Sequence, residues 1–207
     1  YENNLTALNT PNFSAADIAT SADGAYSVFA ADMDGDGDMD IVSASYSDDA
    51  IAWYENDGAA DPSFSAADIA TSADGARSVF AADMDGDGDL DIVSASELDD
   101  TIAWYENDGA ANPSFSSANI ATSADGAESV FAADMDGDGD LDIVSASEYD
   151  DTIAWYENDG AANPSFSASD IATSADGPYS VFLADMDNDG DMDIVSASYA
   201  DDTIAWY

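Results

Sequence analysis

Five aspartates at alternate positions of a nine-residue run are the residues of this sequence best suited to chemistry. The run over residues 83–91 reads Asp-Met-Asp-Gly-Asp-Gly-Asp-Leu-Asp, and it occurs four times at intervals of 51 residues. Calcium binds six to eight hard oxygen ligands in a flexible shell, so we predict one calcium ion per repeat, four per chain. The predicted metal-binding residues are Asp32, Asp34, Asp36, Asp38, Asp40, Asp83, Asp85, Asp87, Asp89, Asp91, Asp134, Asp136, Asp138, Asp140, Asp142, Asp185, Asp187, Asp189, Asp191 and Asp193.

Within each run we expect carboxylates from positions 1, 3, 5 and 9 and a backbone carbonyl from position 7. In the first run the carbonyl belongs to Asp38. Gly35 and Gly37 let the backbone turn sharply enough for the oxygens to converge. Asn188 replaces the first glycine in the fourth run, and asparagine tolerates the left-handed conformation, so we expect the fourth site to survive.

Other interpretations of the acidic run fit less well than this calcium loop. An EF-hand requires Glu at loop position 12, where Ser43 stands, and flanking helices. Magnesium prefers strict octahedral geometry and retains water, which suits this many protein oxygens less well. A solvated acidic turn is the simplest alternative. However, like charges about 5 Å apart repel by roughly 1 to 3 kcal/mol per pair at effective dielectric constants of 20 to 80, so five aspartates without a cation would oppose folding.

Short apolar segments separated by turn residues must position these runs. In the second repeat they span residues 64–71, 78–83, 91–96 and 101–107. Each has the length of a strand, is rich in Ile, Val, Phe, Trp and Tyr, and is flanked by Gly, Pro, Asn or Asp. No segment has the spacing of an amphipathic helix over ten or more residues. The sequence therefore predicts an all-β fold.

Apolar residues occupy both alternating faces of these segments, as in the run from Ile102 to Tyr105, so both faces must be covered. Four-stranded sheets packed around an axis meet this requirement. We predict a β-propeller of four-stranded antiparallel blades, with four 51-residue repeats in one array over residues 1–207. A calcium-binding β-helix has a far shorter repeat. The approximate repeat units are 1–54, 55–105, 106–156 and 157–207.

The two ends of the array suggest how it closes. Residues 12–20 look like a fourth strand without a blade, and the last unit lacks its fourth strand. The N-terminal strand is predicted to close the last blade of its own chain or of a partner chain. The first arrangement gives a four-bladed ring, and the second gives a homodimer that forms an eight-bladed ring. Either arrangement removes exposed sheet edges.

Composition excludes several classes of function. The chain has 46 acidic residues, one Arg and no Lys, with a formal net charge of -45, so it would repel nucleic acid and anionic membranes. It has no Cys and no His, which excludes disulfides, thiolate or imidazole metal sites and histidine-based triads. Every Asp pair belongs to a repeated loop, no unique acidic pair stands apart, and a fully ligated calcium ion leaves no open position for catalysis. We expect no enzymatic activity.

The whole repeat resembles a known family. The acidic run, followed by Ile-Val-Ser-Ala and then by Ile-Ala-Trp-Tyr-Glu-Asn-Asp-Gly, is similar to the VCBS and FG-GAP repeats of integrin-α-like β-propellers. The resemblance implies four-stranded blades with the calcium loop between the first and second strands. It also implies a secreted, extracellular protein that acts in adhesion or ligand binding, and some similar propellers are lectins. The family usually forms about seven blades in one chain, whereas this chain has four repeats.

Differences between the repeats point to a second kind of site. They concentrate just before the first strand and just after the second, on the side of the blade opposite the acidic loops. Loop tips on a rigid scaffold commonly bind ligands, although neutral drift would produce the same variation. The candidate ligand-binding residues are Tyr26, Tyr46, Arg77, Glu97, Glu128, Glu148, Tyr149, Tyr179 and Tyr199. The invariant tryptophans, by contrast, favour packing between blades over sugar stacking.

Two functions from different classes follow. The first is a non-enzymatic, calcium-binding β-propeller that acts outside the cell as a binding or adhesion module for a carbohydrate or protein ligand. The second is a structural scaffold that assembles with its own copies and whose only activity is calcium binding. Near-identity of the repeats also fits a designed or recently amplified array. A glycosidase is a distant third hypothesis.

Overall fold

The computed structural model describes residues 14–207 as an all-β structure. This range contains no helix long and apolar enough to cross a membrane. The strands are β1 (Ala25–Ala31), β2 (Asp40–Ser45), β3 (Ala50–Asn56), β4 (Phe64–Ala70), β5 (Ala76–Ala82), β6 (Asp91–Ser96), β7 (Thr101–Asn107), β8 (Phe115–Ala121), β9 (Ala127–Ala133), β10 (Asp142–Ser147), β11 (Thr152–Asn158), β12 (Phe166–Ala172), β13 (Pro178–Ala184), β14 (Asp193–Ser198) and β15 (Thr203–Trp206).

The strands predicted for the second repeat are confirmed as β4 to β7, with ends displaced by two residues at most. Their composition explains this agreement. β-Branched and aromatic residues pack well on a pleated surface, and Gly, Asn and Asp supply the turns between strands. The all-β prediction is therefore correct for the described part of the chain.

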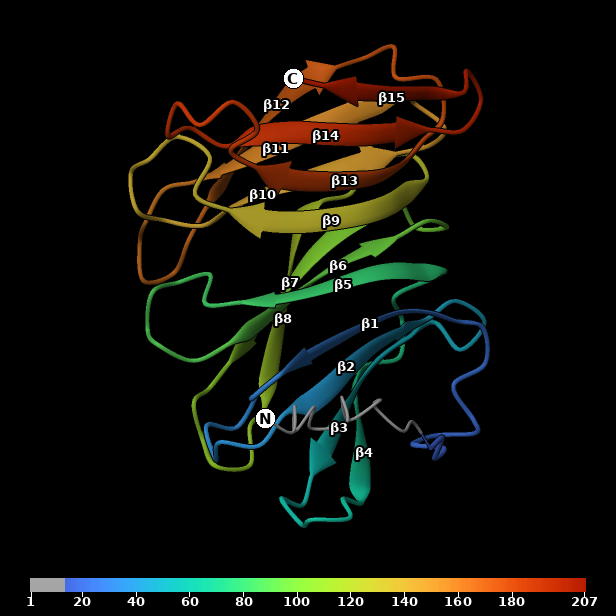
Figure 1. Cartoon of the computed structure of the whole chain (residues 1–207), viewed down its shortest axis with the longest axis vertical. Coiled ribbons are helices and arrows are strands. Elements are labelled where there is room, and N and C mark those ends of the chain that lie inside the picture. The colour runs from blue at the N-terminus through green and yellow to red at the C-terminus, as the bar shows by residue number, and fades with distance from the viewer. Residues whose placement is uncertain (1–13) are drawn as a thin grey trace, which may run out of the picture.

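The strands form four antiparallel sheets in which chain neighbours are paired. Sheet 1 contains β1 to β4, sheet 2 contains β5 to β8, sheet 3 contains β9 to β12, and sheet 4 contains β13 to β15. The first strands of the sheets lie next to one another in series, and the sheets follow one another along the long axis of the molecule (Figure 1). Phe29, Phe80, Phe131 and Phe182 form a continuous row on these strands, with ring centroids 4.8, 4.5 and 4.9 Å apart.

Each sheet has two apolar faces, which we call the forward face and the rear face. The forward face points towards the next sheet in the chain. Ile51 and Trp53 on the forward face of sheet 1 pack against Val79 and Ile92 on the rear face of sheet 2. The same positions pack between sheets 2 and 3 and between sheets 3 and 4. Burial of both faces explains why the strands are apolar on both sides.

Tryptophan packing follows this arrangement. Trp53 and Trp104 are buried, and Trp155 is partly buried against the contact between sheets 3 and 4. The interpretation of the tryptophans as inter-sheet contacts is thus confirmed for these three. Trp206 differs, because it is 57% exposed on the forward face of sheet 4, where the described chain offers no further sheet.

The sheets do not close into a ring within the described chain. Sheet 4 has three strands, as the sequence predicts, and sheets 1 and 4 lie at opposite ends of the long axis (Figure 1). Residues 14–20 form no strand and do not pair with β15, so closure of sheet 4 by its own chain is absent here. Residues 12 and 13 of the predicted strand lie outside the described residues. Pairing with a partner chain stays a prediction.

The sheets divide the chain after residues 70, 121 and 172, whereas the predicted repeat units end at 54, 105 and 156. The repeat length is the same in both divisions, but each sheet ends 16 residues later than the predicted unit. In sheets 1 to 3 the fourth strand follows the predicted boundary in the chain but pairs with the third strand, before that boundary. The strand order is therefore that of an up-and-down sheet, with the acidic runs between its first and second strands.

Candidate functional sites

Each acidic run forms the loop between the first and second strands of a sheet. In the first repeat, Ala31 pairs with Asp40 at the end of the two strands. Gly35 and Gly37 have φ values of 74° and 96°, in the left-handed region. No atom lies near the place where a side chain would project from either glycine, so backbone conformation, not space, requires glycine there. Asn188 adopts φ 63°, which confirms that it replaces glycine conformationally.

Carboxylates converge in all four loops. Oxygens of the first, third and fifth aspartates lie within 4.8 Å of one another in the first three loops. In the fourth loop the group consists of Asp185, Asp187 and Asp193. In the first loop, Oδ1 of Asp32 is buried and has no hydrogen-bond partner. The donor set therefore fits a hard divalent cation, to which this oxygen would be a ligand.

The ninth aspartate of the first three loops also has a structural role that the sequence did not reveal. Asp91 is buried, and its Oδ1 accepts a hydrogen bond from Asn107 N at 2.8 Å while its Oδ2 accepts one from Met84 N at 3.1 Å. Asp40 and Asp142 make the same two bonds. These carboxylates tie the loop to the end of the third strand. Each oxygen keeps a second lone pair for a cation.

The seventh aspartate points out of the acidic group. The carboxylate of Asp38 lies against Gly58, so close that a side chain on this glycine would collide with it. Asp89 and Asp140 lie in the same way against Gly109 and Gly160. These three side chains are thus absent from the convergent carboxylate groups. Their position is compatible with the prediction, in which the seventh residue binds the metal through its main-chain carbonyl and not through its side chain.

Electrostatics of the loops favour a cation. Burial, followed by repulsion from neighbouring aspartates, raises the pKa of Asp34 and of Asp85. Burial raises the pKa of Asp91 to about 6. These shifts express the cost of holding several negative charges together in partly dehydrated surroundings, and a bound cation would remove that cost.

A second group of side chains lies at the opposite ends of the strands. Ala25 pairs with Ser45 at one end of the β1–β2 hairpin, and the acidic loop lies at the other end. The side chains next to Ala25 and Ser45 are therefore far from the acidic loop. There the Tyr26 and Tyr46 rings lie 5.6 Å apart, and the Arg77 guanidinium lies over both, 4.2 and 4.6 Å from their centroids. Cation–π attraction thus holds the only arginine of the sequence against two aromatic rings.

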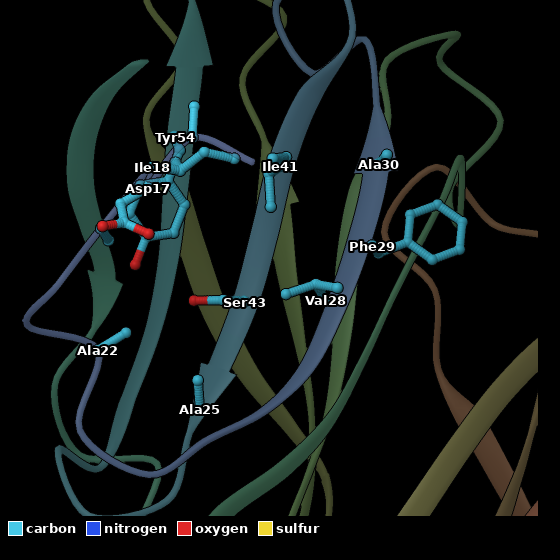
Figure 2. A pocket seen from close by; sticks show the side chains of 12 residues that line it. Asp17, Ile18, Ala22, Ala25, Val28, Phe29, Ala30, Ile41, Ser43 and Tyr54 are labelled. Atoms are coloured by element: carbon cyan, nitrogen blue, oxygen red, sulfur yellow. The ribbon is translucent and has the colours of Figure 1, made fainter. Parts of the chain in front are cut away.

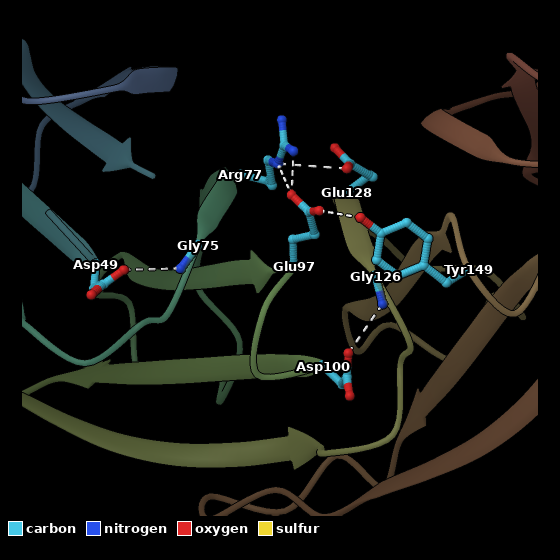
Figure 3. Close-up of polar contacts among 8 residues, drawn as sticks. All are labelled: Asp49, Gly75, Arg77, Glu97, Asp100, Gly126, Glu128 and Tyr149. Carbon is cyan, nitrogen blue, oxygen red and sulfur yellow. Dashed lines mark hydrogen bonds and ion pairs between the residues drawn. The ribbon is translucent and has the colours of Figure 1, made fainter. Parts of the chain in front are cut away.

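Three glutamates gather beside this arginine: Glu97 on its own sheet, and Glu128 and Glu148 on sheet 3. Glu97 accepts hydrogen bonds from Arg77 and from the Tyr149 hydroxyl, and Glu128 Oε1 lies 3.5 Å from Arg77 Nε (Figure 3). Glu148 completes a group of carboxylates within 4.8 Å of one another. Burial and the charges of the other two glutamates raise the pKa of Glu128 to about 7, against the opposing effect of Arg77.

The predicted ligand residues therefore form a connected row across the four sheets. Tyr26, Tyr46, Arg77, Glu97, Glu128, Glu148 and Tyr149 are in contact or share one charge cluster, and the Tyr179 and Tyr199 rings lie 5.7 Å apart at its far end. Glu97 and Glu128 are buried, so they hold neighbouring side chains of the row in place and are not accessible to a ligand. Tyr26, Tyr149, Tyr179 and Tyr199 are exposed.

Sequence reasoning missed a set of polar ties between sheets. Asp49 adopts φ 54° in the turn between β2 and β3, and its Oδ1 accepts a hydrogen bond from Gly75 N at 3.1 Å (Figure 3). Asp100 and Asp151 repeat this bond to the following sheet. Asn107 Nδ2 reaches back to the Met33 carbonyl at 2.9 Å. The recurrence of Asp-Asp in every repeat was the available signal.

Fold and site together define a class: an all-β repeat protein whose antiparallel sheets each carry an acidic loop between the first two strands. The FG-GAP-like repeat model matches residues 32–94, 83–145 and 134–196. These overlapping matches cover most of the chain, so the protein belongs to the FG-GAP-like repeat family. A search of curated proteins finds no match.

Proposed function

We propose that the chain is a non-enzymatic, calcium-binding module of the β-propeller type that works outside the cell and binds a carbohydrate or protein ligand. The observation that carries the metal part of this proposal is the convergence of three carboxylates in every acidic loop. Buried Asp32 Oδ1, which has no hydrogen-bond partner, adds an oxygen that a cation would satisfy. The residues that would hold calcium are the first, third, fifth and ninth aspartates, with the seventh carbonyl.

The ligand part of the proposal rests on the opposite side of the sheets. Four exposed tyrosines lie there beside the ion pair of partly buried Arg77 with buried Glu97. Tyrosine offers an apolar ring and a hydroxyl at low cost in side-chain entropy, which suits the recognition of sugars and of protein surfaces. Because this row differs between repeats while the five aspartates of each acidic loop do not, ligand selectivity is assigned to the row and stability to the loops.

Calorimetric titration of the chelator-treated chain with calcium tests the metal assignment. We expect four sites per chain, and Asp85→Asn should lower the affinity of one of them. Asp68→Asn is the matched control, because Asp68 lies exposed on the outer strand β4, far from the acidic loops in its sheet. A chain that takes up no calcium, or whose Asp68 variant loses a site as the Asp85 variant does, contradicts the assignment.

A glycan array and a panel of matrix proteins test the ligand assignment. Binding that is lost in Tyr26→Ala or Tyr149→Ala, while calcium binding is unchanged, supports a recognition face. The second candidate function, a self-assembling scaffold, is favoured by the hydrogen bonds with which the ninth aspartates join loop to third strand in sheets 1 to 3. Absence of binding across both panels, with calcium sites intact, would favour the scaffold.

A further inference from the structure

The two outermost faces of the chain are the separated halves of one repeated interface. Val28 on the rear face of sheet 1 is 70% exposed, whereas Val79, Val130 and Val181 at the same position of the other sheets are 4 to 5% exposed. Ile204 on the forward face of sheet 4 is 80% exposed, whereas Ile51, Ile102 and Ile153 are completely buried. Each open face thus has the side chains that its counterparts bury against a neighbouring sheet.

Polar groups on the two open faces are also complementary. At every inter-sheet contact a main-chain N–H of the rear face donates to a serine of the forward face, as Val79 N does to Ser27 Oγ at 3.3 Å. Sheet 4 carries the corresponding acceptors, Ser180 and Asp202, and sheet 1 carries the donors, the N–H groups of Val28 and Gly24. Within residues 14–207 these groups make no such inter-sheet bond.

The segment before β1 has the sequence needed to complete sheet 4. Residues 14–19 read Ser-Ala-Ala-Asp-Ile-Ala, identical to residues 65–70 of β4. β4 pairs with β3 of sheet 1 while leading into β5 of sheet 2, so an outer strand belongs to the sheet that precedes it. By this rule residues 14–19 belong to a sheet placed against the rear face of sheet 1.

In the single chain this segment lies over that rear face. Ala16, Asp17 and Ile18 line a pocket together with Val28, Ile41 and Tyr54 of sheet 1 (Figure 2). The pocket is mainly apolar, and it occupies the place that a neighbouring sheet fills elsewhere in the chain. The segment is an incomplete cover, because Val28 stays exposed beneath it.

We propose that a second copy of this chain covers both faces, so that two chains join head to tail in a closed ring of eight sheets. The forward face of sheet 4 in each chain packs on the rear face of sheet 1 in the other, and residues 14–19 of one chain add the fourth strand to the other's sheet 4. Propellers usually have four to eight blades, so chains of four sheets close as one copy or as two. The three internal contacts repeat one hydrogen bond, and the resulting array leaves sheets 1 and 4 far apart (Figure 1), which favours closure by two copies over closure by one.

Sedimentation velocity of the full chain in calcium tests this assembly. We expect twice the chain mass of 21.4 kDa. Val28→Asp and Ile204→Asp should each weaken association by about 100-fold or more, because each buries an unpaired charge in the contact. Both positions are exposed in the single chain, so circular dichroism should show an intact fold. Leu98→Asp is the control, because Leu98 is an exposed side chain of sheet 2, away from both open faces, and should leave the dimer unchanged.

Mixing the two variants tests the head-to-tail pairing. An equal mixture retains one unaltered pair of faces, so a heterodimer should form at concentrations where neither variant associates with itself. A wild-type mass of one chain overturns the proposal, as does growth beyond two copies. Association of either variant with itself to the wild-type extent also overturns it, since such a dimer would not use these faces.

Discussion

At the scale of single residues, the same chemistry has different consequences in different surroundings. Asp34 and Asp91 belong to one kind of loop, yet Asp91 is buried and holds two main-chain N–H groups, whereas Asp34 lies in the convergent group. Glu128 is buried among Arg77, Glu97 and Glu148. Its environment, rather than its type, makes it the residue whose titration should be measurable near neutral pH.

Glu128→Gln should change the pH dependence of stability. The folded-state pKa of Glu128 is raised to about 7, above the value of 4.5 for an ordinary glutamate. The stabilisation that the protonated carboxyl gives the folded state is therefore fully present below pH 4.5 and is lost as the pH rises through 7. Wild type should therefore lose on the order of 1 to 3 kcal/mol more than the variant between about pH 5 and pH 8. Urea denaturation at both pH values measures this, with Glu157→Gln on the exposed side of β11 as control. Parallel curves for wild type and variant would contradict the assignment.

Asn188→Val tests the conformational role of the residue. Asn188 has φ 63°, and a β-branched residue in the left-handed region costs about 1 to 2 kcal/mol. The variant should be less stable by this amount and should bind calcium more weakly in the fourth loop. Asn188→Gly should match wild type in urea denaturation and in calcium titration. If the valine variant did the same, the loop would not depend on this conformation.

At the scale of elements, stability comes from contacts between sheets rather than from any sheet alone. A lone strand or hairpin is marginal in water, and here every internal sheet buries both faces against its neighbours. The repeated hydrogen bonds of Asp49, Asp100 and Asp151 hold consecutive sheets in one relative orientation. The contact between sheets is therefore the repeated structural unit.

Tryptophan truncations should separate internal from outer sheets. Trp104 is buried between sheets 2 and 3, so Trp104→Ala should lower the free energy of unfolding by about 3 to 5 kcal/mol. Trp206 is exposed on sheet 4, so Trp206→Ala should cost the unassociated chain less than about 1 kcal/mol. Chemical denaturation at low protein concentration measures both. Equal costs would mean that the forward face of sheet 4 is covered within one chain.

At the scale of the whole molecule, charge dominates. A formal charge of -45 on 207 residues opposes compaction, and the acidic loops concentrate part of it. The single Arg, on the other side, neutralises little of this charge. Bound metal and added salt should therefore both weaken the repulsion, within the loops and across the whole molecule.

Removal of calcium should lower the melting temperature strongly, because each loop regains its repulsion and metal binding is linked to folding. High salt should restore part of the loss by screening. Differential scanning calorimetry in excess chelator, with and without salt, measures both effects. Equal melting temperatures in chelator and in calcium at moderate salt would show that the loops bind no stabilising ion.

The sequence by itself determined the repeat, the strands and the position of the acidic loops. These properties depend on local spacing and side-chain type, as Gly35 and the run from Ile102 to Tyr105 illustrate. Only the tertiary structure decided that Asp91 ties its loop to β7 and that Glu128 is buried beside Arg77. It also decided that four sheets form an open array. Asp91 meets a main-chain N–H 16 positions away in its own sheet, and Glu128 meets Arg77 across a sheet interface. Both outcomes depend on how strands pair and sheets pack, which no local pattern in the chain encodes.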